Sequence, residues 1–368
     1  MGPMELTREL PPLLLRADAD AERGSGHVMR CLALVQAWRE RGGAAVFLSH
    51  CDSRALRDRI HAAGAEFLPL APELSAEGDL EATIASLAVL DSSFVVLDGY
   101  HFDVNYQHAL RAGGHRLMVI DDTVRLPFYD TDILLNQNLG AARLEYNCHG
   151  GTALLLGPAY ALLRREFPSW RSRLHKVPQT ARKILVTLGG SDPDNATLKV
   201  IQALRTLNRD SIRIRVVAGP ANPHVDELRD AAVAFPGELE LLTAVSDMAS
   251  LMSWADLAVT GAGGTCWELA CVGLPAVLLV IAENQRASAA ELGAAGLVVN
   301  LGWHSDVSVE CLANEINGLI DASSRRLCMS RRGKALVDGH GADRVAATLM
   351  NFAPAMGTSQ STGDYRRL

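Results

Sequence analysis

The chain has 368 residues, of which 48% are hydrophobic and 21% are charged, and its formal net charge is −7. A chain of this length favours two domains, and the negative balance argues against a nucleic-acid-binding surface or a basic membrane-binding face. No apolar run approaches the roughly 18 residues of a membrane-spanning helix, and the early acidic residues and prolines are unlike a signal peptide.

Strand-like and helix-like segments alternate through the first half. Leu13–Leu15 predicts a short buried strand, and the stretch 16–30, which begins as a glycine-containing loop, follows it. Apolar residues recur in steps of three and four from Val28 onward, which predicts a helix that ends at Gly42-Gly43. His27 therefore lies where a glycine loop becomes a helix. A second helix is expected at 54–63, and further strands are expected at 44–49, 94–97, 116–120 and 133–135.

Polar side chains collect where these predicted strands end. They are Arg16, Asp18, His27, Asp98, Tyr100, Asp121, Asp122 and Asn138. Near-continuous apolar strands alternating with helices indicate a parallel sheet covered on both faces, and ligands bind such sheets beyond the carboxyl ends of the strands. We therefore expect a ligand site at this edge, although each aspartate alone is equally well explained as a helix cap or turn residue.

The second half repeats the alternating pattern after a charged, proline-containing connection. In two places a predicted strand is followed by a glycine-containing loop and then by a predicted helix, and these loops lie at 189–194 and 261–265. We expect two doubly wound α/β domains that face each other across a cleft. The predicted division is a leader at 1–12, an N-terminal domain at 13–167, a linker at 168–182, a C-terminal domain at 183–335, a helix at 336–353 and a disordered tail at 354–368.

Seven scattered cysteines include no CxxC pair and have no zinc-ligand spacing. This pattern is typical of reduced thiols in a cytoplasmic protein. We expect a cytoplasmic monomer without a metal or other cofactor, and without nucleic-acid or membrane partners. The Asp192-Pro193-Asp194 segment is better explained by turn chemistry than by a cation site.

The glycine loops differ in the chemistry that they can support. A dinucleotide fingerprint would require a third glycine where Met29 stands, and the chain contains neither a P-loop nor a GxSxG motif. Gly263-Gly264-Thr265 opens a helix, so its N–H groups could hold a diphosphate. Glu268 follows within about one turn and could accept from both ribose hydroxyls, although a surface acid near a helix start explains it too.

Several segments together resemble a known family. They are RADAD…GSGHVMRCLAL, VVLDGYHFD, IDDT, ILLNQN, LLGPAYALLRREF, ILVTLGGSDPDN, DMASLMSWADLAVTGAGGTCWELACVGLP and AENQ. The chain resembles the UDP-2,4-diacetamido-2,4,6-trideoxy-β-L-altropyranose hydrolases of pseudaminic acid biosynthesis and related spore-coat polysaccharide proteins. The second half also resembles UDP-N-acetylglucosamine transferases of peptidoglycan synthesis. The resemblance implies the two-domain GT-B fold.

The resemblance also implies roles for individual residues. It makes His27 the catalytic base and places Tyr100 and Asn284 near the sugar and the attacking water. The UDP-binding residues that we expect are Gly190, Ser191, Ala218, Gly219, Val245, Met248, Gly263, Gly264, Thr265 and Glu268. The substrate-binding residues that we expect are Arg16, Asp18, Gly26, Arg30, Asp98, Asp122 and Gln285. Asp20 departs from the family pattern, in which a small hydroxyl residue is expected.

The expected reaction is hydrolysis of a UDP-linked sugar with inversion. UDP is a weakly basic leaving group, so its departure requires little protonation, and a neutral His27 that activates water could suffice. A glycosyltransferase of the same fold, with His27 acting on an acceptor hydroxyl, remains an alternative. A nucleotide-sugar-binding protein without turnover is a second alternative.

Overall fold

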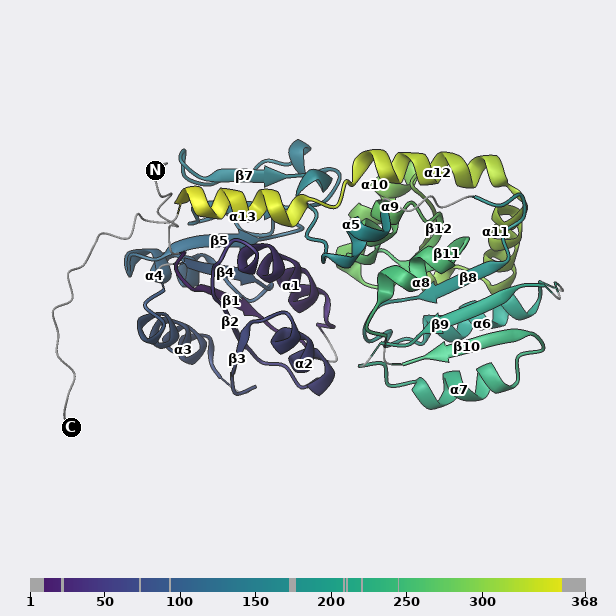
Figure 1. Cartoon of the computed structure of the whole chain (residues 1–368), viewed down its shortest axis with the longest axis horizontal. Coiled ribbons are helices and arrows are strands. Elements are labelled where there is room, and N and C mark those ends of the chain that lie inside the picture. Colours follow the sequence, from purple (N-terminus) through teal and green to yellow (C-terminus); the bar gives the residue numbers. More distant parts are fainter. Residues whose placement is uncertain are drawn as a thin grey trace, which may run out of the picture.

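The computed structural model describes residues 10–20, 23–72, 74–92, 94–171, 177–207, 209, 211–219, 221–243 and 245–352. Within these ranges the chain forms two α/β domains that lie side by side (Figure 1). The expected tail at 354–368 and most of the expected leader, residues 1–9, lie outside the described residues.

The N-terminal domain is built on a seven-stranded sheet in which every neighbouring pair is parallel. Its strands are β1 (Leu13–Ala17), β2 (Ala45–Ser49), β3 (Glu66–Pro69), β4 (Phe94–Asp98), β5 (Arg116–Ile120), β6 (Ile133–Asn136) and β7 (Ala153–Leu156). Their spatial order is β3-β2-β1-β4-β5-β6-β7. The order reverses between β1 and β4, which gives the doubly wound sheet a switch point there.

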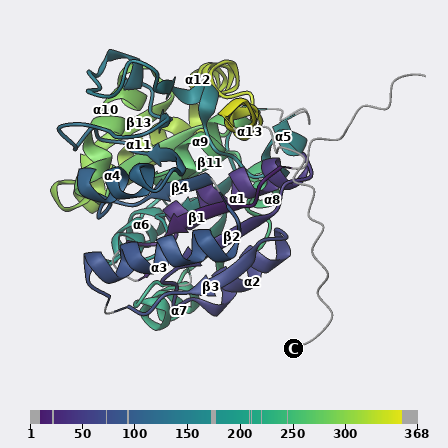
Figure 2. The same ribbon diagram turned by 90° about the vertical axis from the view of Figure 1, so that its left-hand side faces the viewer.

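Helices cover both faces of this sheet (Figures 1 and 2). They are α1 (Gly26–Arg39), α2 (Arg54–Ala62), α3 (Ala76–Val89) and α4 (Val104–Ala112), with short 3-10 helices η1 (Ala141–Arg143) and η2 (Pro158–Tyr160). Leu13 and Leu15 pack with α1 and α2, whereas Leu14 packs with α3 and α4. Successive strand residues thus enter opposite cores, which explains why the strands are apolar without interruption.

The C-terminal domain repeats this arrangement with a six-stranded parallel sheet. Its strands are β8 (Lys183–Thr187), β9 (Arg213–Val217), β10 (Glu238–Leu242), β11 (Leu257–Gly261), β12 (Ala276–Val280) and β13 (Val298–Trp303). The spatial order is β10-β9-β8-β11-β12-β13, and it reverses between β8 and β11.

Helices also cover both faces of the second sheet. They are α6 (Ala196–Arg205), α7 (Val225–Val233), α8 (Met248–Trp254), α9 (Thr265–Val272), α10 (Arg286–Ala294), α11 (Val309–Asp321) and α12 (Ser323–Leu336), with 3-10 helices η3 (Glu283–Gln285) and η4 (His304–Asp306). Buried side chains of α6, α7 and α11 fill the core on one face, and those of α8, α9 and α10 fill the core on the other. The predicted pair of doubly wound parallel sheets is confirmed.

Two segments connect the domains. Helix α5 (Glu166–Arg171) occupies the start of the expected linker and packs against α8 and α9 of the C-terminal domain. Helix α13 (Gly341–Phe352) then returns and packs on α1 of the N-terminal domain (Figure 1). The domain boundaries given above stay predictions. None of the helices in the described ranges is both long and apolar enough to cross a membrane.

Candidate active site

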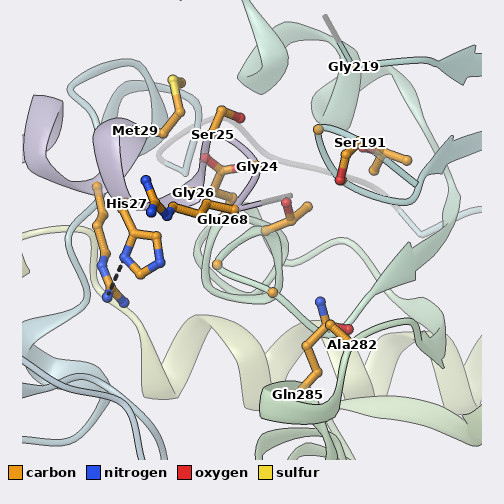
Figure 3. A pocket seen from close by; sticks show the side chains of 18 of the residues that line it. Gly24, Ser25, Gly26, His27, Met29, Ser191, Gly219, Glu268, Ala282 and Gln285 are labelled. Carbon is orange, nitrogen blue, oxygen red and sulfur yellow. Dashed lines mark hydrogen bonds between the residues drawn. The ribbon is translucent and has the colours of Figure 1, made fainter. Parts of the chain in front are cut away.

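The carboxyl ends of the two sheets border one cavity of about 990 Å³ between the domains. Both switch points open onto it, because the loops that follow β1, β4, β8 and β11 all contribute lining residues. Figure 3 shows His27 on one side of this cavity and Ser191, Ala282 and Gln285 on the other. The convergence expected from the sequence therefore joins residues of both halves of the chain.

His27 occupies the first turn of α1, as the glycine loop predicted. Gly24 adopts a left-handed backbone with φ of 70°, and α1 begins at Gly26, so the imidazole is presented to the cavity. The Nδ1 atom of His27 lies 2.6 Å from Oδ1 of Asp98, the last residue of β4. A carboxylate can only accept, so Nδ1 carries the proton and Nε2 is the acceptor of a neutral imidazole.

Asp98 is fully buried at the wall of the cavity, where it contacts His27 and Arg30, and its expected role in substrate binding stays a prediction. Arg30 donates from Nε to Oδ2 and from Nη2 to Oδ1 of Asp98, each at 2.6 Å. Burial raises the pKa of Asp98, but the charges and hydrogen bonds of Arg30 and His27 outweigh it and hold the pKa well below its usual range. Asp98 is therefore ionised at neutral pH and lies on the Nδ1 side of the His27 ring.

Arg30 extends this chain of contacts to Asp122. Its Nη1 atom donates to Oδ2 of Asp122 at 2.6 Å, and both side chains line the cavity. Asn138 also lines the cavity and donates to the Asp122 carbonyl at 3.1 Å. Asp121 does not line it, because its carboxylate caps the following turn through the Thr123 amide at 2.8 Å.

Tyr100 and Asn284 meet across the cleft. Nδ2 of Asn284 donates to the Tyr100 hydroxyl at 2.8 Å, which joins the C-terminal domain to the loop after β4. The Tyr100 ring stands edge-on to the His27 imidazole, with centroids 5.3 Å apart and an interplanar angle of 85°. Burial raises the pKa of Tyr100, with the nearby Asp122 adding to it, so the hydroxyl stays protonated at neutral pH. We refer to this pair as the Tyr100–Asn284 bridge.

Arg16 is placed differently from our expectation. Its side chain is 2% exposed and does not line the cavity, so the expected contact with substrate is corrected. The guanidinium is bound by Asp18 and by Asp79, which lies on α3. Arg16 thus fixes Asp18, which does line the cavity and whose Oδ1 also accepts from the His50 amide at 2.8 Å.

His101 is a cavity residue that the sequence reasoning missed. Its Nε2 atom lies 3.5 Å from Oδ2 of Asp18. Burial and the nearby charge of Arg16 lower the pKa of His101 to about 4, so it is neutral at neutral pH. Asp20, the departure from the family pattern, does not line the cavity; its carboxylate accepts from the Arg23 amide at 2.7 Å, and the Arg23 side chain does line the cavity.

On the C-terminal side, two glycine loops approach very closely. A Cβ atom placed on Gly219 would lie 2.3 Å from the carbonyl oxygen of Gly190, so no side chain fits at that point. The other expected UDP-binding residues near these loops, Ser191, Ala218, Val245 and Met248, also line the cavity.

The start of α9 presents its backbone to the cavity. Gly263, Gly264 and Thr265 line the cavity, and the first N–H groups of a helix have no partner within the helix. Glu268, in the first turn of α9, lines the cavity and accepts from Nη2 of Arg164 at 3.3 Å. Burial raises the pKa of Glu268, and Arg164 opposes that rise. The N-terminus of α9 has the features of an anion site with a carboxylate beside it.

Gln285 braces this loop. Its Oε1 atom accepts from the Ala262 amide at 3.2 Å and from the Ile281 amide at 3.1 Å, while the residue lines the cavity. The carbonyl half of the side chain is therefore committed to the backbone. Only the amide nitrogen is available for the substrate contact that we expected. Gly26 also lines the cavity, as expected.

Comparisons with known proteins agree with this architecture. Residues 184–343 match the glycosyltransferase family 28 C-terminal domain. The chain is 27% identical over 337 residues to the spore coat polysaccharide biosynthesis protein SpsG of Bacillus subtilis, covering 91% of this chain and 97% of that one. It is 25% identical over 230 residues to a Helicobacter pylori protein named pseudaminic acid cytidylyltransferase and UDP-2,4-diacetamido-2,4,6-trideoxy-beta-L-altropyranose hydrolase, covering 62% of this chain and 40% of that one.

The structure is also similar to the crystal structure of MurG from Acinetobacter baumannii. The TM-score is 0.65 at 17% sequence identity, with 93% of this chain and 99% of that chain covered. This likeness confirms the fold that the resemblance implied. The chain has the GT-B fold, and the match over residues 184–343 supports a glycosyltransferase-like protein.

Proposed function

We propose that the protein hydrolyses a UDP-linked 2,4-diacetamido-2,4,6-trideoxy hexose, releasing UDP and the free sugar with inversion at the anomeric carbon. The observation that carries this proposal is the Tyr100–Asn284 bridge beside His27. In this proposal the bridge, which joins the two domains next to the base, would admit water and restrict the approach of a larger acceptor.

The chemistry assigned to His27 follows from its partners. Nε2 of His27 takes a proton from water while the water oxygen forms a bond to the anomeric carbon. The bond from that carbon to the diphosphate oxygen breaks, and its electron pair leaves with UDP. Asp98 stabilises the imidazolium that forms, and general-base help of this kind is worth about 10² to 10⁴ in rate.

The C-terminal domain would hold the leaving group. The N–H groups at the start of α9 would bind the diphosphate and stabilise the charge that grows on it. Glu268 would accept from the ribose hydroxyls. The segments around Ala218 and Val245 would hold the uracil, and the loop that contains Ser191 would lie beside the diphosphate.

The identity of the sugar rests on similarity. The name of the Helicobacter pylori relative includes this hydrolase activity, and the family resemblance, which runs from Arg16 to Gln285, supports the same sugar. We accordingly place the reaction in the biosynthesis of nonulosonic acids such as pseudaminic acid. A cytoplasmic, monomeric enzyme that uses no metal and binds neither nucleic acid nor membranes remains our prediction.

A glycosyltransferase is the second candidate. The match to a glycosyltransferase family 28 domain favours it. In that reaction His27 would take its proton from an acceptor hydroxyl in place of water. The two candidates share the donor site and differ in what reaches the anomeric carbon.

Release of UDP in the absence of any acceptor separates these candidates. The purified protein is incubated with the UDP-sugar alone, and UDP and free sugar are followed by phosphorus and proton NMR. We expect both products in equal amounts and a loss of about 10² to 10⁴ in kcat for His27→Ala. His61→Ala, at an exposed position on α2, serves as the control. No UDP release by the wild type, or full activity of His27→Ala, contradicts the proposal.

A further inference from the structure

Arg59 brings a positive charge to the cavity from the N-terminal domain. It lies on α2, is half-buried and lines the cavity. Its Nη2 atom donates to the backbone carbonyl of Val245 in the opposite domain, and its Nη1 atom lies 4.0 Å from Sδ of Met29. In the part of the chain that the structure describes, no carboxylate oxygen lies within 4 Å of this guanidinium. Its polar partner across the cleft is therefore a neutral one.

The other arginines of the cavity have carboxylate partners. Arg30 is held by Asp98 and Asp122. Arg164 lies 3.1 Å from Glu166 and 3.3 Å from Glu268. Arg23 pairs with Asp18 at 3.4 Å and with Asp20 at 3.2 Å. Arg59 thus differs from them in having a cationic group that is not already neutralised.

The surroundings of Arg59 penalise an unpaired charge. Burial lowers the pKa of Arg59 and the positive charge of Arg164 lowers it further, while the negative charges of Glu166 and Glu268 oppose these effects. Two guanidinium groups that repel each other at a cavity wall favour an anion near them. Glu268, in the first turn of α9, lines the same cavity as Arg59.

We propose that Arg59 binds the diphosphate of the nucleotide sugar and thereby draws the N-terminal domain onto the donor. On binding, Arg59 exchanges the neutral Val245 carbonyl for a diphosphate oxygen, because an anionic phosphate oxygen binds a guanidinium more strongly than an uncharged carbonyl does. The diphosphate is then held from both sides, by the backbone of α9 and by α2. This inference rests on the proposed function for the identity of the ligand.

The test compares UDP with uridine, which lacks the phosphates. Binding is measured by isothermal titration calorimetry for the wild type, Arg59→Gln and Arg57→Gln. Arg57 lies on the same helix and donates to the Cys51 carbonyl at 2.9 Å within its own domain, away from the cavity. We expect Arg59→Gln to weaken UDP by about 10- to 100-fold, to leave uridine unchanged and to reduce the salt dependence of UDP binding. Arg57→Gln is expected to bind both ligands as the wild type does.

Two outcomes overturn the inference. One is unchanged UDP affinity in Arg59→Gln, and the other is an equal loss for UDP and uridine, which identifies Arg59 as a contact between the domains only. Arg59→Met and Arg59→Lys supply the same comparison if Arg59→Gln does not fold, with Lys expected to keep part of the preference for UDP. Binding requires no turnover, so a failure of hydrolysis is distinguishable from a failure of this inference.

Discussion

Replacing Asp98 with asparagine tests the central contact of the site. The substitution keeps the size of the side chain and removes its charge. Asp98, which is itself fully buried, makes three short and partly buried contacts at 2.6 Å, one to His27 and two to Arg30. We expect Asp98→Asn to lose both catalytic rate and stability, because an amide neither fixes the His27 tautomer nor neutralises Arg30.

The size of each loss follows from the geometry. Breaking a buried ion pair by removing one partner costs about 3–5 kcal/mol of the free energy of unfolding. Asp122 remains to pair with Arg30, which points to the lower end of that range. A domain is typically stable by about 5–15 kcal/mol, so the variant still folds. The rate falls by about 10² to 10⁴ if His27 loses its function as a base.

The pH dependence of the free energy of unfolding provides an independent test of the Asp98 contacts. The pKa of Asp98 is lower in the folded protein than its ordinary value of 3.8. Its stabilising contribution is therefore complete above pH 3.8 and is lost as the pH falls below that value toward the folded pKa. The difference in free energy of unfolding between the wild type and Asp98→Asn should narrow across that acid window.

The assays are urea unfolding followed by circular dichroism and steady-state hydrolysis of the UDP-sugar. Asp52→Asn is the control, because its carboxylate is exposed and lies outside the cavity. An Asp98→Asn variant with wild-type kcat, or with an unchanged free energy of unfolding at neutral pH, refutes the reasoning about this contact.

Three further predictions concern other parts of the cavity. Tyr100→Phe removes the hydroxyl that Asn284 binds, so methanol should compete with water more effectively than it does in the wild type. In dilute methanol the share of methyl glycoside among the products, measured by mass spectrometry, should therefore rise. An unchanged share contradicts the assignment of the bridge. Glu268→Gln should weaken uridine binding by about tenfold in calorimetry, because a neutral amide accepts more weakly from ribose; equal affinity contradicts a ribose contact. Gly219→Ala should abolish tight UDP binding or lower Tm, because the added Cβ meets the Gly190 carbonyl at 2.3 Å; wild-type values of both quantities refute that close approach.

The sequence allowed the core of the site to be predicted because its signals are local. His27 follows a glycine loop, and Asp98 ends an apolar strand, so both could be assigned to the carboxyl edge of a parallel sheet. The hydrogen bond between these two residues, which are 71 positions apart, depends on β1 and β4 being neighbours in the sheet. Periodicity does not reveal which strands are neighbours.

The features that the sequence did not predict depend on contacts between residues that are far apart in the chain or on side chains without an apolar pattern. Arg16 stands at a strand end like Asp18, but Asp79 on α3, 63 residues away, draws it into the protein. Arg59 lies on an ordinary amphipathic helix, and only the fold brings it to Val245. The edge strand β3 was missed because its side chains are exposed or half-buried and lack an apolar run.

The most direct test of the account is hydrolysis of the UDP-sugar in H₂¹⁸O without an acceptor. Water attack at the anomeric carbon predicts that ¹⁸O appears in the released sugar and that UDP carries none. The first anomer seen by NMR should have the inverted configuration. Label in the phosphate of UDP, retention of configuration, or UDP release only after an acceptor is added would contradict the account.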